Sequence, residues 1–361
     1  RIIKPTFNIY TDTLSTINLT IIILVSYISM IMISSNDFHP PNHLKNAHIQ
    51  SIMNSIGPRK YRSILIQKKL TTRQLILKSR NDIRLIADFD CAQVSNKTIV
   101  ILLHGWEGSS RSAYQVTTAF KLLEHGFDVL RINFRDHGGS HHLNRHFFNS
   151  TMSEEVAEAI EIFLNGHNYQ HVFLAGFSLG GSFALRIAAD QGDRLKLCAT
   201  AAVSPPVDPV NTMANLNKAF FIYERYFYRR WKHSLKAKQA AFPEYDFLNE
   251  LKAARSLNDL NELFIPRYTR YPTPTAYFSA YAITGNRLTS LNSHAYLIAA
   301  EDDPVIPSSD IDLINPTTAL AINLQKYGGH CGFIKDCLAN SWIETKLVEI
   351  FEHHRCLSLN K

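Results

Sequence analysis

Cysteine is scarce in this chain, and its few cysteines lack the spacing of a disulfide framework or a zinc finger. Their number is odd, and they are scattered along the sequence at Cys91, Cys198, Cys331, Cys337 and Cys356. Reduced thiols and an intracellular, cytoplasmic setting are the expected consequence. The sequence also lacks an RNP-type motif and a heptad repeat, so we do not expect nucleic acid as a partner.

Acidic residues are missing from one long basic stretch, although the net charge of the whole chain is only +7. The charged residues between positions 59 and 80 are all basic, namely Arg59, Lys60, Arg62, Lys68, Lys69, Arg73, Lys78 and Arg80. A second basic cluster comprises Arg225, Arg229, Arg230, Lys232, Lys236 and Lys238. Such clusters either form solvated positive faces or contact anionic lipid at a membrane surface. Charge alone does not decide between the two interpretations.

The first part of the chain lacks alanine and glycine, because neither occurs in residues 1–29. Residues 17–33 are mostly apolar and approach the minimum length of a membrane-spanning helix. One interpretation of residues 1–35 is therefore an N-terminal membrane anchor. The other is an over-extended reading frame, because the chain begins with arginine and its first methionines are Met30 and Met32. A signal peptide is less favoured, since no small-residue cleavage site follows the apolar run.

Short apolar runs and helix-forming segments alternate regularly through the first half of the chain. Strands are predicted at 98–103, 128–133, 171–176 and 197–203, and helices at 112–125, 153–165 and from residue 179 onward. This alternation predicts a parallel, doubly wound α/β sheet with right-handed crossovers. Between residues 61 and 90, short β-rich runs predict an antiparallel start to the sheet. Thr151 and Glu154 give a capping-box signal for the second helix.

The alternation breaks between residues 206 and 292, where long helical segments carry many aromatic side chains. These aromatics are Phe220, Phe221, Tyr223, Tyr226, Phe227, Tyr228 and Trp231. Strands at 293–300 and 319–324 and a final helix at about 339–354 then complete the α/β pattern. We therefore expect a core formed by residues 36–205 and 293–361, with a helical insertion at 206–292. Its aromatics either form its own core or line an apolar substrate pocket.

Residues 176–181 (GFSLGG) form the most informative motif in the chain. A serine flanked by glycines two residues away on either side, between a buried strand and a helix, is the nucleophile-elbow pattern. The tight turn requires glycine at Gly176 and Gly180, because larger side chains would clash there. Ser178 is thereby held beyond the sheet edge at the positive end of the following helix. The pattern predicts Ser178 as a catalytic nucleophile.

A serine nucleophile needs a base, usually a histidine oriented by a carboxylate, in the chain order Ser, acid, His on this scaffold. Residues 301–303 are acidic and follow the predicted strand 293–300. We choose Asp303, because Pro304 fixes the backbone directly after it, and keep Asp302 as the reserve. His330 lies between glycines after the predicted strand 319–324, at the same sheet edge. The neighbouring Cys331 lacks an elbow, so packing is its expected role.

An oxyanion hole requires two backbone N–H groups directed at the negative oxygen of the tetrahedral intermediate. Leu179, the residue after the nucleophile, is expected to supply one of them. The loop after strand 98–103 is expected to supply the other. In that loop Gly105 lets the backbone turn toward the site, and the N–H of Trp106 is the candidate donor.

The motifs together resemble the α/β-hydrolases, and within them the YheT-like branch of esterases, whose eukaryotic relatives include membrane-anchored lipases. The resemblance is carried by residues 103–110, 133–140, 176–181, 302–304 and 328–333, with a weaker match at 40–50. It implies an α/β-hydrolase fold with an inserted helical cap at 206–292, and Ser178, Asp303 and His330 as the catalytic triad. The chain departs from the pattern at Asp136, where many relatives have a small residue, and in residues 268–281. Both departures leave substrate choice open.

A cluster of histidines follows Asp136, at His137, His141, His142 and His146. Because no helical face aligns these side chains, we interpret the cluster as a polar loop near the pocket mouth and expect no metal. The sequence therefore predicts a serine esterase for small-molecule or lipid esters, without a cofactor and with contact to a membrane surface left open. Thioester cleavage or acyl transfer on the same triad, and ligand binding without turnover, are the alternatives.

Overall fold

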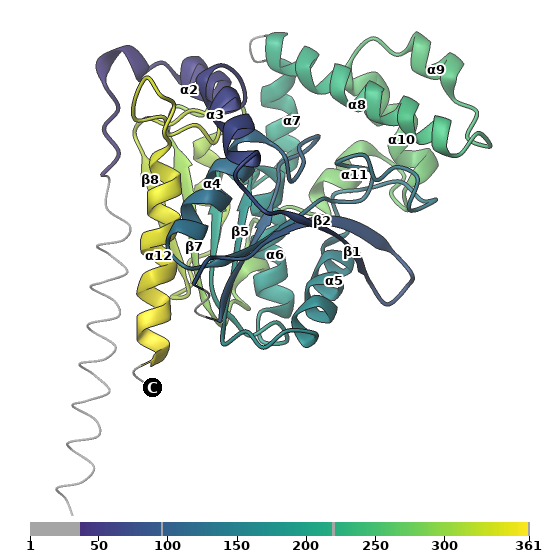
Figure 1. The fold of residues 1–361 in the computed structure, drawn as a ribbon. Coiled ribbons are helices and arrows are strands. Elements are labelled where there is room, and N and C mark those ends of the chain that lie inside the picture. The colour runs from purple at the N-terminus through teal and green to yellow at the C-terminus, as the bar shows by residue number, and fades with distance from the viewer. Residues whose placement is uncertain (1–36, 95–96, 219–220, 360–361) are drawn as a thin grey trace, which may run out of the picture.

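The computed structural model describes residues 37–94, 97–218 and 221–359, so the predictions for residues 1–35 and for Phe220 lie outside the described residues. An eight-stranded sheet in the order β1-β2-β4-β3-β5-β6-β7-β8 forms its centre (Figure 1). The strands are β1 (Arg73–Lys78), β2 (Arg84–Asp90), β3 (Thr98–Leu103), β4 (Asp128–Ile132), β5 (His171–Phe177), β6 (Leu197–Val203), β7 (His294–Ala300) and β8 (Leu320–Gln325). The α/β fold class predicted from the sequence is confirmed.

The sheet is antiparallel at one edge and parallel elsewhere. β2 pairs antiparallel with both β1 and β4, whereas every later neighbouring pair of strands is parallel. β3, β4 and β5 are buried along their whole length. Strands covered on both faces need no polar side, which explains the continuous apolar runs at residues 99–103 of β3 and 172–177 of β5. β4 differs, because it also buries Asp128 and Arg131. The C-terminal ends of the parallel strands meet at one edge, which is where ligands bind in such sheets.

Helices cover both faces of the sheet (Figure 1). α4 (Ala113–Glu124) and α12 (Trp342–Leu359) share one apolar core with Val100 and Leu102 of β3. α5 (Ser153–Asn165) and α6 (Leu179–Gln191) share the other core with Ile99 and Ile101. Successive β3 residues thus point to opposite faces and stabilise two separate helix layers.

Three short elements precede the sheet: η1 (Asn42–Leu44), α2 (Ala47–Met53) and α3 (Pro58–Gln67). The prediction of β-rich structure from residue 61 is wrong for residues 61–67, which belong to α3. Pro58 stands at the first position of α3, where proline is favoured because its missing N–H would be unpaired anyway. α3 packs against α4, so tertiary contact supports a helix that its β-branched residues disfavour.

The insertion between β6 and β7 is helical. It contains α7 (Pro209–Lys218), α8 (Phe221–Ala241), α9 (Leu248–Ala253), α10 (Leu257–Tyr268), α11 (Pro274–Ser279) and η2 (Asn286–Leu288), and η3 (Ser308–Leu313) follows β7. α8, α9 and α10 bury their own apolar cluster, which includes Leu235, Leu251 and Phe264, and they lie to one side of the sheet (Figure 1). Among the described helices, none combines the length and apolar character needed to cross a bilayer.

The predicted capping box at the start of α5 is wrong. Met152 is the N-cap residue, and no side chain caps the helix. The Thr151 hydroxyl instead donates to Oδ1 of Asn149 at 2.6 Å. A short polar turn thus takes the hydroxyl that the sequence pattern assigns to the helix N-terminus.

The two basic clusters are not simple solvated faces. The Arg59 side chain is buried and pairs with Glu344 at 2.9 Å, and it also contacts Thr117 and Asn54. In the second cluster Lys238 is buried and pairs with Asp136 at 2.8 Å. Buried charges of this kind require such partners, because an unpaired ion in the interior is very costly. For these two residues, the interpretation as a solvated face is wrong.

Candidate active site

Ser178 occupies the sharp turn between β5 and α6. Its backbone adopts φ 53° and ψ −123°, a left-handed conformation that is rare and strained for any residue other than glycine. The strain is maintained because β5 is fully buried before the turn and the buried first turns of α6 follow it. The predicted elbow therefore has the geometry that exposes a serine hydroxyl at the end of a strand.

Gly176 and Gly180 are required by close backbone contacts at this turn. A Cβ on Gly176 would lie 2.0 Å from the carbonyl oxygen of Gly180. A Cβ on Gly180 would lie 2.4 Å from the carbonyl oxygen of Leu103 at the end of β3. Both contacts are with backbone atoms, which cannot move aside without shifting the strand or helix. The absence of these two side chains lets α6 approach the sheet closely.

Substituting alanine for Gly180 is expected to destabilise the protein by about 3 kcal/mol or more, because the new methyl group would overlap the β3 backbone. Thermal or urea unfolding measures the loss directly. Gly166→Ala is the matched control, since its Cβ would meet only the carbonyl of Phe163 at 3.5 Å, an ordinary contact. Equal stability of the two variants would contradict the packing argument.

The structure brings Ser178, His330 and Asp303 together in one hydrogen-bonded line. The Ser178 hydroxyl lies 2.9 Å from Nε2 of His330. Nδ1 of His330 lies 2.9 Å from Oδ2 of Asp303. With Asp303 accepting from Nδ1–H, Nε2 is free to accept the Ser178 proton. These residues come from the β5–α6 turn, the loop after β8 and the loop after β7.

Asp303 is held by its own loop. Its second oxygen, Oδ1, accepts from the backbone N–H of Val305 at 2.8 Å and of Ile306 at 3.0 Å, and its side chain is only 2 % exposed. The reserve candidate, Asp302, accepts instead from the N–H of Gly329 at 2.8 Å. Of the acidic residues 301–303, Asp303 is thus the one in contact with His330.

The environment of His330 favours its protonated form. Burial of the imidazole is the largest single influence and lowers the pKa of His330, but the Asp303 carboxylate and the neighbouring Cys331 together raise it by more, so the net pKa lies well above the ordinary value. The backbone N–H of His330 donates to the hydroxyl of Ser51 in α2 at 2.8 Å. This contact joins the histidine loop to a helix residue 279 positions earlier in the chain. The arrangement can hold a cation that forms during proton transfer from Ser178.

The loop after β3 lies directly beside Ser178. A Cβ on Gly105 would lie 3.2 Å from the Cβ of Ser178, and the N–H of Gly105 donates to the hydroxyl of Tyr114 at 2.9 Å. Trp106 and Leu179 line the same cavity as Ser178. Leu179 is the first residue of α6, so its N–H has no partner within the helix. Trp106 and Leu179 thus lie on the two segments next to Ser178, and the role of their N–H groups as oxyanion donors stays a prediction.

Two buried histidines support the same loop. Nδ1 of His104 lies 2.7 Å from the carbonyl of Gly105, and its Nε2 accepts from the N–H of Phe134 at 3.1 Å. Nε2 of His137 accepts from the N–H of Glu107 at 3.1 Å. Burial lowers the pKa of His104 to about 4 and that of His137 well below its ordinary value. Both rings are therefore neutral near pH 7 and act as hydrogen-bonding supports.

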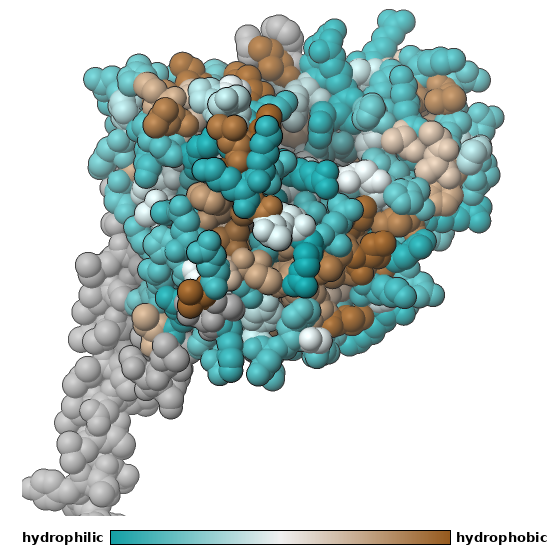
Figure 2. Space-filling model, in the orientation of Figure 1, coloured by the Kyte–Doolittle hydropathy of each residue, from teal (hydrophilic) through white to brown (hydrophobic). Residues whose placement is uncertain are grey.

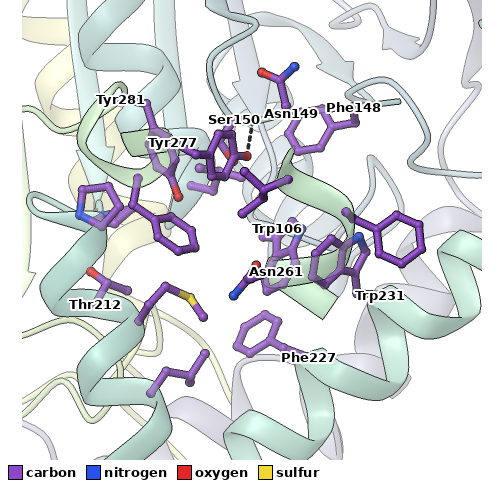
Figure 3. Close-up of a pocket in the computed structure, with 18 of the residues that line it drawn as sticks. Trp106, Phe148, Asn149, Ser150, Thr212, Phe227, Trp231, Asn261, Tyr277 and Tyr281 are labelled. Atoms are coloured by element: carbon purple, nitrogen blue, oxygen red, sulfur yellow. Dashed lines mark hydrogen bonds between the residues drawn. The ribbon is translucent and has the colours of Figure 1, made fainter. Parts of the chain in front are cut away.

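A cavity that is partly open to solvent lies beneath the helical insertion, and Ser178 is one of the residues that line it. Figure 3 shows many of the other lining residues. Trp106 and Leu179 line the cavity from the core, and Phe227 and Trp231 line it from α8. Trp106 stacks on Phe227 with ring centroids 5.3 Å apart. Among the described residues that line the cavity, none is Asp, Glu, Lys or Arg. Such a cavity accommodates an apolar, uncharged group next to the Ser178 hydroxyl.

Comparison with known proteins gives the family directly. Residues 98–319, more than half of the chain, match the family described as "alpha/beta hydrolase fold". The chain belongs to the alpha/beta hydrolase family. It is 25% identical over 326 residues to the putative esterase YheT of Escherichia coli, covering 87% of this chain and 92% of that protein. This supports the YheT-like branch within the alpha/beta hydrolases.

Other alpha/beta hydrolase relatives are more distant. Mouse phospholipase ABHD3 is 24% identical over 67% of this chain and 59% of its own length. The yeast medium-chain fatty acid ethyl ester synthase/esterase 2 is 22% identical over 70% of this chain and 61% of its own length. The solved structure of the Pyrococcus furiosus esterase Pf2001 has a TM-score of 0.54 and 16% identity, covering 80% of this chain and 92% of that one. At that identity the structural likeness shows the fold alone.

In this alpha/beta hydrolase, His141 of the histidine cluster and Cys331 both contact neighbouring groups of the protein. His141 contacts the Ser234 hydroxyl of α8 at 2.8 Å, so the loop packs against the insertion. No group of three or more His, Cys, Asp or Glu that could hold a metal occurs within the described parts of the chain. Cys331 is buried, and its thiol faces the carbonyl of Val203 at 3.6 Å.

Several residues of the site were not identified from the sequence. His104 and Ser51 act through contacts with residues far along the chain, so no local pattern marks them. Asn261 does leave a sequence signal, because it falls on the buried side of α10 together with Leu257 and Phe264. A polar residue at a core-facing helical position is the kind of exception that periodicity can find.

Proposed function

We propose that this alpha/beta hydrolase is a serine esterase that cleaves carboxylic esters through an acyl-enzyme. The observation that carries the proposal is the hydrogen-bonded line from Ser178 through His330 to Asp303, with 2.9 Å at each step. Distances of this length permit proton transfer from nucleophile to base. The esterase names of its relatives support the same reaction class.

The reaction follows from these roles. Ser178 attacks the ester carbonyl while His330 takes its proton, and Asp303 orients the ring and stabilises its cation. The N–H groups of Trp106 and Leu179 bind the oxyanion. His330 returns the proton to the leaving alcohol, and a water molecule then releases the acyl group by the same steps in reverse. No step needs a cofactor.

The substrate class that fits best is a neutral small-molecule or lipid ester with an apolar acyl group. The cavity beside Ser178 is lined mainly by apolar and aromatic side chains. Two relatives carry names of lipid-ester enzymes, mouse phospholipase ABHD3 and yeast monoacylglycerol lipase. Hydrolysis of 4-nitrophenyl esters from acetate to laurate by the purified protein tests the proposal. Absence of turnover across the series would contradict it.

Acyl transfer to an alcohol is the second candidate. The yeast relative whose name includes both synthase and esterase favours it. The same acyl-enzyme serves both reactions, and only the acceptor differs. Partition between free acid and ethyl ester at increasing ethanol concentration separates them. A thioesterase would prefer acyl thioesters in the same assay, and a non-catalytic binding protein would give no product.

We further propose that one surface contacts an anionic lipid membrane. The α2–α3 surface consists of exposed apolar residues interleaved with exposed lysines, namely Ile49, Ile52, Ile56, Tyr61, Ile64 and Leu65 with Lys60, Lys68 and Lys69. Figure 2 shows apolar and polar side chains intermixed over this part of the molecule. Apolar residues among cations suit a negatively charged lipid interface. Ser51 of α2 also contacts the His330 loop, which places the surface near the candidate site.

Charge reversal on this surface tests the lipid contact. Lys60→Glu, Lys68→Glu and Lys69→Glu together are expected to weaken binding to phosphatidylserine vesicles by about 100-fold or more, since each basic residue contributes about 1 kcal/mol at such a surface. Hydrolysis of a water-dissolved ester is expected to be unchanged. The control reverses Lys97, Lys196 and Lys252, which are exposed and belong to other parts of the chain. Equal vesicle binding by both triple variants would contradict the proposal.

The location that we propose for the protein is the cytoplasm. Its free thiols support this location, because disulfides are rare in that compartment.

A further inference from the structure

Asn261 is a polar residue on the buried side of α10, where its neighbours are apolar. Leu257, Leu260, Phe264 and Ile265 form the rest of this side, and all are buried. Asn261 itself is only 5% exposed, and it lines the cavity that contains Ser178. Its amide points into the open space between Trp106 and Phe227 (Figure 3). A polar side chain thus reaches into a cavity that is otherwise mostly apolar.

The Asn261 amide forms no hydrogen bond within the described residues, unlike three other polar side chains that line the cavity. The Thr212 hydroxyl donates to the carbonyl of Asp208 at 3.0 Å. The Tyr277 hydroxyl accepts from the N–H of Ser150 at 2.7 Å, and Oδ1 of Asn149 accepts from the N–H of Thr151. These groups are occupied by their own loops and helices. Asn261 alone among the four offers both a carbonyl oxygen and an NH₂ group to a bound molecule.

The Asn261 amide gains no hydrogen bond from the described protein groups, so only solvent in the partly open cavity or a bound molecule can pair with it. Burial of a polar group without a partner costs free energy, and an apolar side chain of the same size would avoid that cost. Leucine would match the neighbouring cavity-lining side chains. Residues that reduce stability in this way are found where function requires them.

We propose that Asn261 is a specificity-determining residue that hydrogen-bonds an oxygen on the acyl chain of the substrate. The inference rests on the proposed function, because the acyl group attached to Ser178 would occupy this cavity. The amide can donate to a hydroxyl or an oxo group and can accept from a hydroxyl. The part of the cavity wall that the structure describes contains no Asp, Glu, Lys or Arg, so the oxygen belongs to a neutral group rather than a carboxylate. The preferred substrates are esters of hydroxy or oxo fatty acids.

The test compares ethyl octanoate with a set of ethyl hydroxyoctanoates and oxooctanoates that differ in the position of the oxygen. The wild-type protein is expected to prefer one position over the plain ester by about 10- to 100-fold in kcat/KM, the range of one buried hydrogen bond and its unpaired alternative. In Asn261→Leu this preference is expected to disappear, with a rise in kcat/KM for the plain ester. A wild-type protein without preference at any position, or a variant that retains it, overturns the proposal.

Asn258→Leu is the matched control, because Asn258 lies on the same helix three residues earlier and is exposed to solvent. It is expected to keep the wild-type preference. Asn261→Leu is expected to fold and to melt at or above the wild-type temperature, since it removes an unpaired buried amide. A clearly lower melting temperature would show that the amide has a structural partner, and would overturn the proposal.

Two further experiments distinguish a failure of this inference from a failure of the proposed esterase function. Plain octanoyl glycerol carries its extra oxygens on the alcohol, so a dependence on Asn261 seen only with this ester overturns the acyl assignment. Ser178→Ala allows binding of free hydroxyoctanoic and octanoic acids to be measured without turnover, from the fluorescence of Trp106 and Trp231 in the cavity. Tighter binding of the oxygenated acid, lost in Ser178→Ala/Asn261→Leu, supports the inference even if no ester is hydrolysed. Equal binding of the two acids overturns it while leaving esterase activity intact.

Discussion

Replacing Ser178 with alanine is expected to lower kcat for ester hydrolysis by about 10⁴-fold or more, because the covalent route is lost and only binding and oxyanion stabilisation remain. The substitution removes a single oxygen that lies 2.9 Å from Nε2 of His330. KM is expected to change little, since the cavity is unaltered. Steady-state kinetics with a 4-nitrophenyl ester, together with circular dichroism, separates lost chemistry from lost folding.

Ser182→Ala is the control for this experiment. Ser182 is a buried serine one turn later in α6, and it does not line the cavity around Ser178. Its removal is expected to leave turnover within about two-fold of the wild-type rate, as for most changes outside a site. A folded Ser178→Ala protein with undiminished turnover would show that another group performs the reaction.

Substituting asparagine for Asp303 is expected to lower kcat by about 10³- to 10⁴-fold, because the amide neither stabilises the imidazolium nor selects the correct tautomer of His330. Asp302→Asn is the matched control, since Asp302 contacts the N–H of Gly329 rather than the imidazole. Its loss is expected to stay below about 10-fold, the size of one hydrogen bond. Similar losses for both variants would contradict the assignment of Asp303.

The pH dependence of ester hydrolysis by the wild-type protein and by Asp303→Asn adds an independent readout. Burial lowers the pKa of His330, and Asp303 and Cys331 together raise it by more, so the net pKa is well above the ordinary imidazole value. Only neutral His330 can accept the Ser178 proton, so activity is expected to fall as pH decreases through this raised pKa. Removing the carboxylate charge lowers that pKa, and the acidic limb of the Asp303→Asn profile is expected to move to lower pH. A limb that stays in place would show that another group controls it.

The sequence predicted the central part of the fold because its signals there are local. The elbow around Ser178 depends on glycines two residues away and on a strand and helix directly beside it, all readable from one short segment. Asp303 and His330 follow strands β7 and β8, and parallel strands carry their C-terminal loops to one edge. Chain order and strand ends were therefore enough to place three distant residues near each other.

Other features depend on contacts that no local pattern records. Arg59 was grouped with exposed basic residues, but its partner Glu344 lies 285 residues further along the chain. The Thr151 hydroxyl was assigned to a helix cap, but a nearby Asn149 competes for it. Residues 61–67 contain β-branched and aromatic side chains, yet packing against α4 favours a helix. In each case tertiary contacts override a weak local preference.

The most direct test of the account is covalent labelling of the wild-type protein with a fluorophosphonate, followed by peptide mass mapping. An activated serine attacks such a probe, whereas an ordinary surface serine does not. We predict a single adduct on Ser178, absent from Ser178→Ala and strongly slowed in Asp303→Asn. An unlabelled wild-type protein, or an adduct on Cys331 or another residue in place of Ser178, would contradict the claim that this serine is the nucleophile.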